Sequence, residues 1–408
     1  MKIALVAQNA TPLHPRAGSG PDRDDVGLSE LTRKLAGQGH QVTVYAQKSD
    51  PGLPDQAELH AGVRIEHIDA GPVSVAGEQG DADLLERVPA FSGPLRNRWH
   101  ADRPDVVHAL RWTSGLAALA ATRDLGIPVV QEFSSLGVTE RRTAPQRGAK
   151  RAGKKATDAA AARLRLEPAI GRSATAVVAT NSAEVADLTH LGVHRAAIRM
   201  VPWGVDTELF TPEGPTAERN GRARLLTAAD LSERLPLESL LRALTRVPGA
   251  ELLVVGGPAE AELDQDDSYV KLAKCAASLG VSDRVIFTGK VDYPAMPALL
   301  RSADLVVSTC QYEPAGTTSL QAMACGTPVI APPVGGHLDA VVDGTTGILI
   351  PPDRPALLAQ RIRQLLAHPM LIEAYGVAAA DRARSRYSWD RIANETLAVY
   401  DRATAQAA

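Results

Sequence analysis

The sequence alternates short apolar runs with longer stretches in which apolar residues recur at helical spacing. The short runs are rich in β-branched residues, and most of the intervening helical stretches end at a glycine. This alternation is typical of a parallel sheet covered by helices on both faces. In the first half the predicted strands are residues 2–8, 41–47, 105–110, 128–133 and 175–181, and the predicted helices include 26–40 and 114–126.

The alternation stops in a polar stretch rich in Pro and Gly at residues 204–221 and then begins again. Such a stretch is typical of a linker between two domains. The second series predicts strands at 224–230, 251–257, 284–289, 305–310, 328–333 and 347–352. It predicts helices at 235–244, 267–280, 295–303 and 355–368, and a final helix at 388–408. The pattern therefore predicts two α/β domains.

Length and composition agree with this picture. A chain of 408 residues is long for a single core, and 45% hydrophobic with 22% charged residues is typical of a globular protein. A net charge of -3 argues against a general nucleic-acid binder. No apolar run reaches the roughly 20 residues of a membrane span, and residues 1–10 lack a signal-peptide pattern. We expect a cytoplasmic protein.

The cysteines give little sign of chemistry. Cys275, Cys310 and Cys325 form no CxxC pair. Their number suits a reducing compartment, and their spacing predicts neither a disulfide framework nor a zinc site. We therefore expect no bound metal.

The segment 139–172 is more basic than the rest of the chain. It contains ten Lys or Arg residues against three acidic ones, a local balance of +7. Such a run is usually a solvated loop and helix face. The alternative is a surface for an anionic acceptor or an acidic membrane, and the second would make the protein membrane-associated.

The stretch from Glu313 to Pro333, EPAGTTSLQAMACGTPVIAPP, combines an acid, small residues and the start of a helix directly after a predicted strand. Ligands of parallel α/β sheets bind at the carboxyl ends of strands. A helix start lined by small residues attracts anions through its unpaired N–H groups. Glu313 could hold sugar hydroxyls beside it. The alternative is a capped helix with a structural Glu. The candidate phosphate ligands are Gly316, Thr317, Thr318 and Ser319, and Gln321 follows on the same helix face.

The same stretch resembles the nucleotide-sugar motif of the retaining glycosyltransferases of family 4, which have the GT-B fold. Further segments agree, in order along nearly the whole chain: 104–110, 112–130, 201–212, 296–309 and 386–400. The resemblance implies two Rossmann-like domains that face each other across a cleft, an acceptor domain at 1–205 and a donor domain at 206–388. A C-terminal helix, about 389–408, crosses back to the first domain. It also implies that the reaction needs no metal and no cofactor beyond the nucleotide sugar.

In that family an Arg and a Lys after the first strand of the donor domain stabilise the leaving diphosphate, and Glu binds the sugar. Here Asp230 and Leu235 stand at the two basic positions, and Gln321 replaces a second Glu that binds the ribose. Arg234 lies beside the vacant position and Lys290 follows another strand, so either base could supply the charge. Arg222 and Arg224 also lie close by in the sequence.

The first half departs from the family as well. Asp22 and Arg23 occupy the place of a glycine pair, although Gly18 and Gly20 could serve if the loop is reshaped. Ser134 replaces a His, while His108 is retained. His108 could line the acceptor side or be a packed, hydrogen-bonded residue at a strand end.

These observations favour a retaining glycosyltransferase that moves a sugar from a nucleoside-diphosphate donor to an acceptor hydroxyl, with Glu313 and Arg234 as its catalytic residues. A catalytically impaired relative that acts as a binding or helper partner is the alternative, because several motif positions differ. A different reaction in a reshaped site, such as an epimerisation or a phosphorolysis, also stays open. No GxGxxG follows the first strand in register, so a dehydrogenase is disfavoured.

Overall fold

The computed structural model describes residues 1–9, 23–71, 80–143, 154–232 and 234–407. These residues form two compact units. Unit 1 contains the described residues up to Pro202 and those from Ile392 onward, and unit 2 is Trp203–Arg391. None of the described helices is both long and apolar enough to span a membrane.

Unit 1 is built on a sheet whose described strands follow the order β3-β4-β2-β1-β5-β6-β7-β8. The strands are β1 (Lys2–Val6), β2 (Gln41–Gln47), β3 (Gln56–His60), β4 (Val63–Ile68), β5 (Val106–Leu110), β6 (Val129–Glu132), β7 (Ala176–Ala179) and β8 (Ile198–Met200). The helices are α1 (Arg23–Gly37), α2 (Asp81–Ala101), α3 (Trp112–Thr122), α4 (Gly137–Thr143), α5 (Lys154–Ser173) and α6 (Ser182–His190). Neighbouring strands pair in parallel except β3 with β4, which is an antiparallel edge pair.

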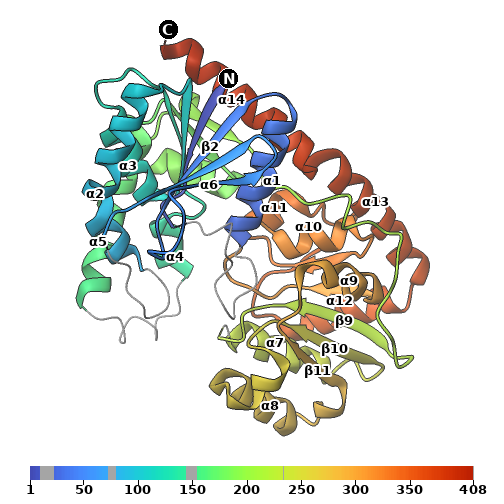
Figure 1. Ribbon diagram of the computed structural model, residues 1–408. Helices are drawn as coiled ribbons and strands as arrows, with labels where there is room; N and C mark the ends of the chain where they lie inside the picture. Colours follow the sequence, from blue (N-terminus) through green and yellow to red (C-terminus); the bar gives the residue numbers. More distant parts are fainter. Residues whose placement is uncertain (10–22, 72–79, 144–153, 233, 408) are drawn as a thin grey trace. The chain divides into compact units, whose positions relative to one another are not determined.

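Alternate residues of the unit 1 strands enter different cores, as the two-residue period of a strand requires. On one face, Ala4 and Val6 of β1 pack with Phe91 and Trp99 of α2. Helices α2, α3 and α5 lie together over this face (Figure 1). The central strands are buried on both faces, because Ile3 and Leu5 are buried as fully as their neighbours. This double burial is why the strands of the sequence read as continuous apolar runs.

The C-terminal helix α14 (Trp389–Ala407) begins in unit 2 and packs for most of its length on unit 1. The hydroxyl of Tyr400 lies 2.8 Å from Nδ1 of His108, and the two rings meet edge to face at 5.6 Å. Near the start of its unit 1 portion, Asn394 accepts a hydrogen bond of 3.1 Å from Gln38. A buried polar contact with β5 and a surface contact with the residue after α1 thus hold this helix on unit 1.

Unit 2 contains a second sheet, with the order β11-β10-β9-β12-β13-β14 among the described strands. The strands are β9 (Ala223–Ala228), β10 (Ala250–Val255), β11 (Val285–Gly289), β12 (Leu305–Val307), β13 (Val329–Ala331) and β14 (Gly347–Leu349). The helices are α7 (Arg234–Leu244), α8 (Asp267–Ser278), α9 (Met296–Ser302), α10 (Thr317–Ala324), α11 (Gly336–Ala340), α12 (Pro355–Leu366) and α13 (Pro369–Tyr387). All strand pairs are parallel.

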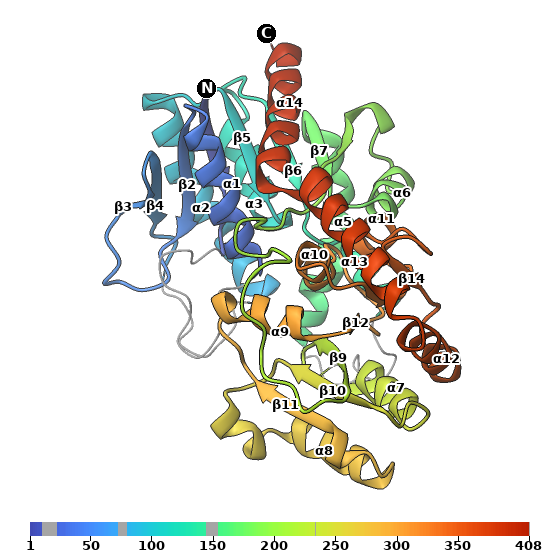
Figure 2. The same cartoon turned by 90° about the vertical axis from the view of Figure 1, so that its right-hand side faces the viewer.

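Helices cover both faces of the unit 2 sheet. Leu225 of β9 belongs to a core completed by α7, α8 and α12, whereas its neighbour Leu226 belongs to a core completed by α9, α10 and α13. Strands β9, β10 and β11 lie side by side in Figure 2. The prediction of two α/β units with parallel sheets is therefore confirmed.

A buried acid in unit 1 makes its stability depend on pH. Glu184, in the first turn of α6, is 7% exposed, and burial raises its pKa to about 7. Its carboxyl group accepts hydrogen bonds from the backbone N–H and the hydroxyl of Thr180, which partly oppose the shift. Because the folded pKa exceeds the ordinary value, the folded chain holds this proton more tightly. Its contribution to the free energy of unfolding therefore falls as pH rises from about 4.5 to about 7.

We expect Glu184→Gln to remove this dependence. The stability of the variant relative to the native protein should rise between pH 5 and pH 8, because Gln stays neutral while Glu184 must ionise in a buried place. Urea unfolding at several pH values measures the difference. A difference that does not change with pH would contradict the shifted pKa.

Candidate functional site

The carboxyl ends of β9 and β12 form the point where the strand order of unit 2 reverses. From β9 the sheet continues through β10 and β11 in one direction and through β12, β13 and β14 in the other. Open parallel sheets bind ligands at such a reversal, because the loops that leave two neighbouring strands diverge there. The stretch that begins at Glu313 leaves β12 at this point.

Glu313 is fixed to the start of the helix that follows it. The backbone N–H of Gly316 donates a 2.9 Å hydrogen bond to Oε1 of Glu313. Gly316 has φ 70°, the left-handed region that favours glycine, and its carbonyl accepts the first bond of α10, 2.9 Å from the N–H of Leu320. The acid and the helix start therefore form one local unit, as the sequence suggested.

The first turn of α10 has unused hydrogen-bonding groups. Within the described residues no side chain caps the helix, and its first N–H groups have no intrahelical partner. The hydroxyl oxygens of Thr317 and Ser319 are buried and lack a partner among the same residues. Buried polar atoms are normally satisfied. Two unsatisfied hydroxyls at the positive end of a helix therefore indicate an anion site.

The loop after β13 presses against this turn. The N–H of Gly336 donates a 2.8 Å hydrogen bond to the carbonyl of Glu313. A Cβ at Gly335 would lie 1.9 Å from that carbonyl oxygen, and one at Gly336 would lie 2.5 Å from the carbonyl carbon of Ala315. Only glycine fits at these two positions. The glycine pair thus fixes the position of the Glu313 backbone against the loop after β13.

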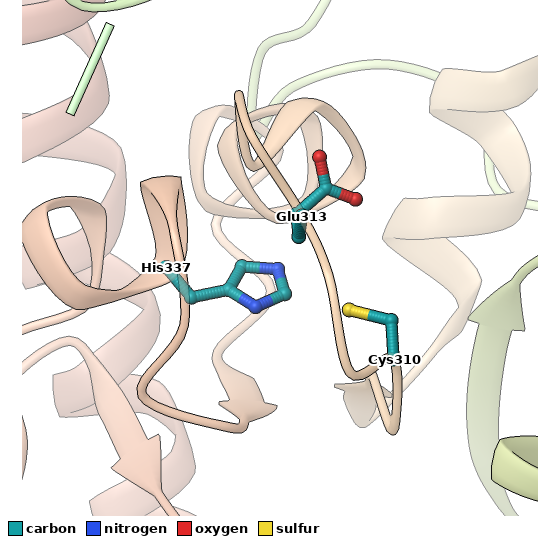
Figure 3. Close-up of side chains that lie close together, drawn as sticks. All are labelled: Cys310, Glu313 and His337. Atoms are coloured by element: carbon teal, nitrogen blue, oxygen red, sulfur yellow. The ribbon is translucent and has the colours of Figure 1, made fainter. Parts of the chain in front are cut away.

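This loop also brings in His337, which the sequence analysis did not single out. His337 is 2% exposed, and its ring points from α11 toward Glu313 and Cys310 (Figure 3). Ligand atoms of these three side chains all lie within 4.8 Å of one another. Burial lowers the pKa of His337, and the Glu313 carboxylate opposes that shift. The signal in the sequence was its place one residue beyond a glycine pair at the end of the neighbouring strand.

The basic candidates lie at different places. Arg234 is the first residue of α7, and its side chain is outside the described part. The hydroxyl of Thr309 donates a 2.9 Å hydrogen bond to the carbonyl of Pro236, so the loop leading to Glu313 touches the start of α7. Lys290 follows β11, two strands from β9 on the same edge of the sheet.

Three further charged residues in and around β9 have local partners. Asp230 accepts a 2.9 Å hydrogen bond from the N–H of Ser232, which shapes the turn after β9. Arg224 is buried in β9, where it pairs with Glu251 at 2.6 Å. Arg222 precedes β9 and pairs with Asp283. The last two arginines therefore lie toward the amino end of the strand, away from Glu313, and cannot replace the missing base.

The first-half candidates are placed as follows. His108 is 1% exposed and bonded to Tyr400, and burial lowers its pKa to about 4. This geometry matches the packed alternative that the sequence analysis left open for His108.

The other candidates lie elsewhere. Ser134 follows β6 and has φ 58°, an uncommon conformation for a residue other than glycine. Gly18 and Gly20 lie outside the described residues. Gln321 is 8% exposed within α10.

Part of the basic segment has its charge compensated. Arg163 is 9% exposed and pairs with Glu167 at 2.6 Å and Glu140 at 2.9 Å. Arg142 pairs with Asp187 at 2.9 Å, a residue outside the segment. The side chains at 144–155 lie outside the described part. A surface for an anionic acceptor or an acidic membrane stays a prediction here.

Comparisons with known proteins agree with this architecture. A family model described as glycosyl transferases group 1 matches residues 214–382, and one described as a glycosyl transferase 4-like domain matches residues 25–204. A D-inositol 3-phosphate glycosyltransferase of Frankia alni is 32% identical, over 97% of this chain and 99% of that protein. A protein of the same name from Streptomyces bingchenggensis is 30% identical, over 98% and 89%.

Solved structures give the same result. Sucrose-phosphate synthase from Thermosynechococcus elongatus matches with a TM-score of 0.84 and 26% identity over 99% of both chains. HepE of Anabaena, solved with UDP and glucose, has the same fold, with a TM-score of 0.69 and 19% identity over 98% of both chains. The chain belongs to the group 1 glycosyltransferases of family 4, with the GT-B fold. It is a glycosyltransferase, and the helper alternative is not favoured.

The glycine pair can be tested directly. We expect Gly336→Ala to lower the free energy of unfolding by roughly 1–3 kcal/mol, because the new Cβ meets backbone that cannot yield cheaply. Gly249→Ala is the control, since a Cβ there meets nothing within 4 Å. Thermal and urea unfolding compare the two. Equal stability of both variants would show that the loop after β13 does not fix the Glu313 turn.

Proposed function

We propose that the chain moves a sugar from a nucleoside-diphosphate donor to an acceptor hydroxyl, with retention at the anomeric carbon and without a metal or other cofactor. One observation carries the proposal: directly after Glu313 lies a helix start that no side chain caps, with two hydroxyls that have no hydrogen-bond partner among the described residues. A diphosphate supplies acceptor oxygens for these donors, and a sugar attached to it would bring hydroxyls to the acid.

We assign the donor-binding roles from the positions of the residues at the start of α10. The N–H groups at the start of α10 and the hydroxyls of Thr317 and Ser319 bind the diphosphate, with Gly316 and Thr318 lining the same turn. Glu313 keeps Oε1 on the Gly316 N–H and uses its carboxylate to hold sugar hydroxyls. Gln321, one turn further along α10, hydrogen-bonds to the ribose.

The leaving diphosphate gains negative charge as the sugar departs, so a cation must face it. Arg234 is our candidate, because the hydrogen bond between Thr309 and Pro236 joins the start of α7 to the loop that leads to Glu313. Lys290, on the same edge of the sheet, is the second. These bases take over the task of the family's Arg and Lys, whose positions hold Asp230 and Leu235.

The proposed reaction breaks one bond, forms one bond and moves one proton. The bond between the anomeric carbon and the phosphate oxygen breaks, and the acceptor oxygen forms its bond to the same carbon from the same face. The acceptor proton passes to the leaving phosphate oxygen, so no protein base is required. This route suits a chain in which His108 is buried and neutral.

The acceptor we propose is a small phosphorylated polyol. Relatives named D-inositol 3-phosphate glycosyltransferase match this chain at 30–32% identity over nearly its full length. The basic segment 139–172 would suit the phosphate of such an acceptor, and an acidic membrane surface is the second candidate for it.

Donor binding is tested by titration calorimetry with a panel of nucleoside diphosphates. We expect micromolar binding of one of them, and roughly tenfold or greater loss of affinity in the double variant Thr317→Val, Ser319→Ala, because hydrogen bonds to a charged group are worth about 1.5–3 kcal/mol. Ser278→Ala, an exposed hydroxyl in α8, is the control. Failure of every nucleotide to bind would refute the donor site.

Catalysis is tested with inositol phosphate as the acceptor and the nucleotide sugar chosen by that titration. Arg234→Ala should lower kcat by about 10²–10³, the usual cost of losing one group that stabilises a developing anion. Lys290→Ala should lower it less if Arg234 carries the charge. Proton NMR of the product reports the anomeric configuration. An inverted product would overturn the retaining mechanism. Full activity in a variant that combines Arg234→Ala with Lys290→Ala would exclude both bases.

A further inference from the structure

Cys310, Glu313 and His337 lie on two loops that leave the carboxyl ends of neighbouring strands. The first two residues follow β12, and His337 follows β13. Their ligand atoms lie within 4.8 Å of one another. In Figure 3 the Cys310 thiol and the His337 ring point toward each other, and Glu313 lies beside them with its carboxylate oxygens directed away. We propose that these residues bind one zinc ion through the thiolate, a carboxylate oxygen and an imidazole nitrogen, with the fourth position open.

The donor set selects the metal. A thiolate and an imidazole favour zinc over magnesium or calcium, which prefer oxygen ligands. Zinc bonds of about 2.0–2.3 Å in a tetrahedron place ligand atoms about 3.5 Å apart. Because the ligand atoms lie up to 4.8 Å apart, they must move about 1 Å closer together to bind zinc. Cys310 and Glu313 are partly exposed, so small rotations of their side chains can supply it.

His337 is the fixed member of the set. Its ring is 2% exposed, and its Nδ1 has no hydrogen-bond partner among the described residues. An unsatisfied buried nitrogen is costly unless something binds the ring. A metal site of this kind takes the neutral imidazole and the thiolate as its ligands. Binding then releases the proton of the Cys310 thiol.

Zinc at this place would act on the reaction. If Glu313 holds the donor sugar, as the proposed function has it, an ion on its carboxylate and a bound donor compete for the same group. Zinc is then an inhibitor and the reaction itself stays independent of metal. Only this second step rests on the proposed function.

Binding is tested on the full-length, reduced, metal-free protein with cobalt(II) as a coloured substitute for zinc. We expect one equivalent of cobalt to give a thiolate charge-transfer band and the visible bands of tetrahedral coordination, and zinc to displace both. Cys310→Ser should lose the charge-transfer band, and His337→Gln should weaken binding at least tenfold. Cys275→Ser removes a thiol in α8 and should behave as the native protein.

The outcomes separate the claims. Loss of the band in Cys310→Ser alone, with unchanged circular dichroism and thermal unfolding, supports the site. Absence of any band, or a band that survives Cys310→Ser, overturns it whatever the activity. Zinc inhibition that is competitive with the nucleotide sugar and weakened at least tenfold in Cys310→Ser supports the second step. Metal binding without transferase activity would leave the zinc site and refute the proposed function.

Discussion

The close contact between two backbone segments at the ends of β12 and β13 determines the candidate site. Gly336 donates to the carbonyl of Glu313, and neither Gly335 nor Gly336 has room for a Cβ. Because backbone meets backbone, the turn cannot drift without losing a buried hydrogen bond. That contact places the Glu313 carboxylate, the uncapped start of α10 and the ring of His337 within one small region. A side-chain contact between long, flexible residues would hold them far less rigidly.

This rigidity explains how the site can keep its binding geometry while its charges change. In the proposed function, backbone N–H groups and the hydroxyls of Thr317 and Ser319 bind the diphosphate, and these groups do not depend on the residues in the loop after β9. That loop in turn is shaped by Asp230, whose carboxylate accepts the hydrogen bond of the Ser232 N–H. It brings a negative charge to a position where the family has an Arg. Transition-state stabilisation is more demanding than binding, because it needs charge at the atoms where charge develops. We therefore expect the substitutions at the motif positions to lower the rate more than the affinity for the proposed donor.

The sequence predicted the fold well where periodicity is strong. The central strands were found because burial on both faces makes them apolar throughout, and α7, α8 and α12 because one face alone is apolar. Helix α2 was not predicted, since Pro89 and Pro94 lie inside it. Helix α13 was not predicted either, because its apolar residues do not gather on one side. The β3–β4 pair lies at the sheet edge, where β3 is only partly buried and its residues carry a weak strand signal.

The site was predicted as far as it is local in sequence. The link between Glu313 and Gly316 spans three residues, so the motif contains it. His337 lies 24 residues beyond Glu313 and is brought there by β13, which no spacing rule for metal or catalytic residues covers.

His108 shows the reverse case. A position near the carboxyl end of a parallel strand suggests a ligand-binding residue, but successive side chains of a strand point to opposite faces. In β5, Val107 and Ala109 face the α2 and α3 layer, and His108 faces α14, where Tyr400 holds it. The carboxyl end of a strand indicates where a site lies. The face of the sheet to which a side chain points decides whether it reaches that site. The charge of segment 139–172 is likewise not a property of the segment alone, because Asp187, which lies outside it, neutralises Arg142.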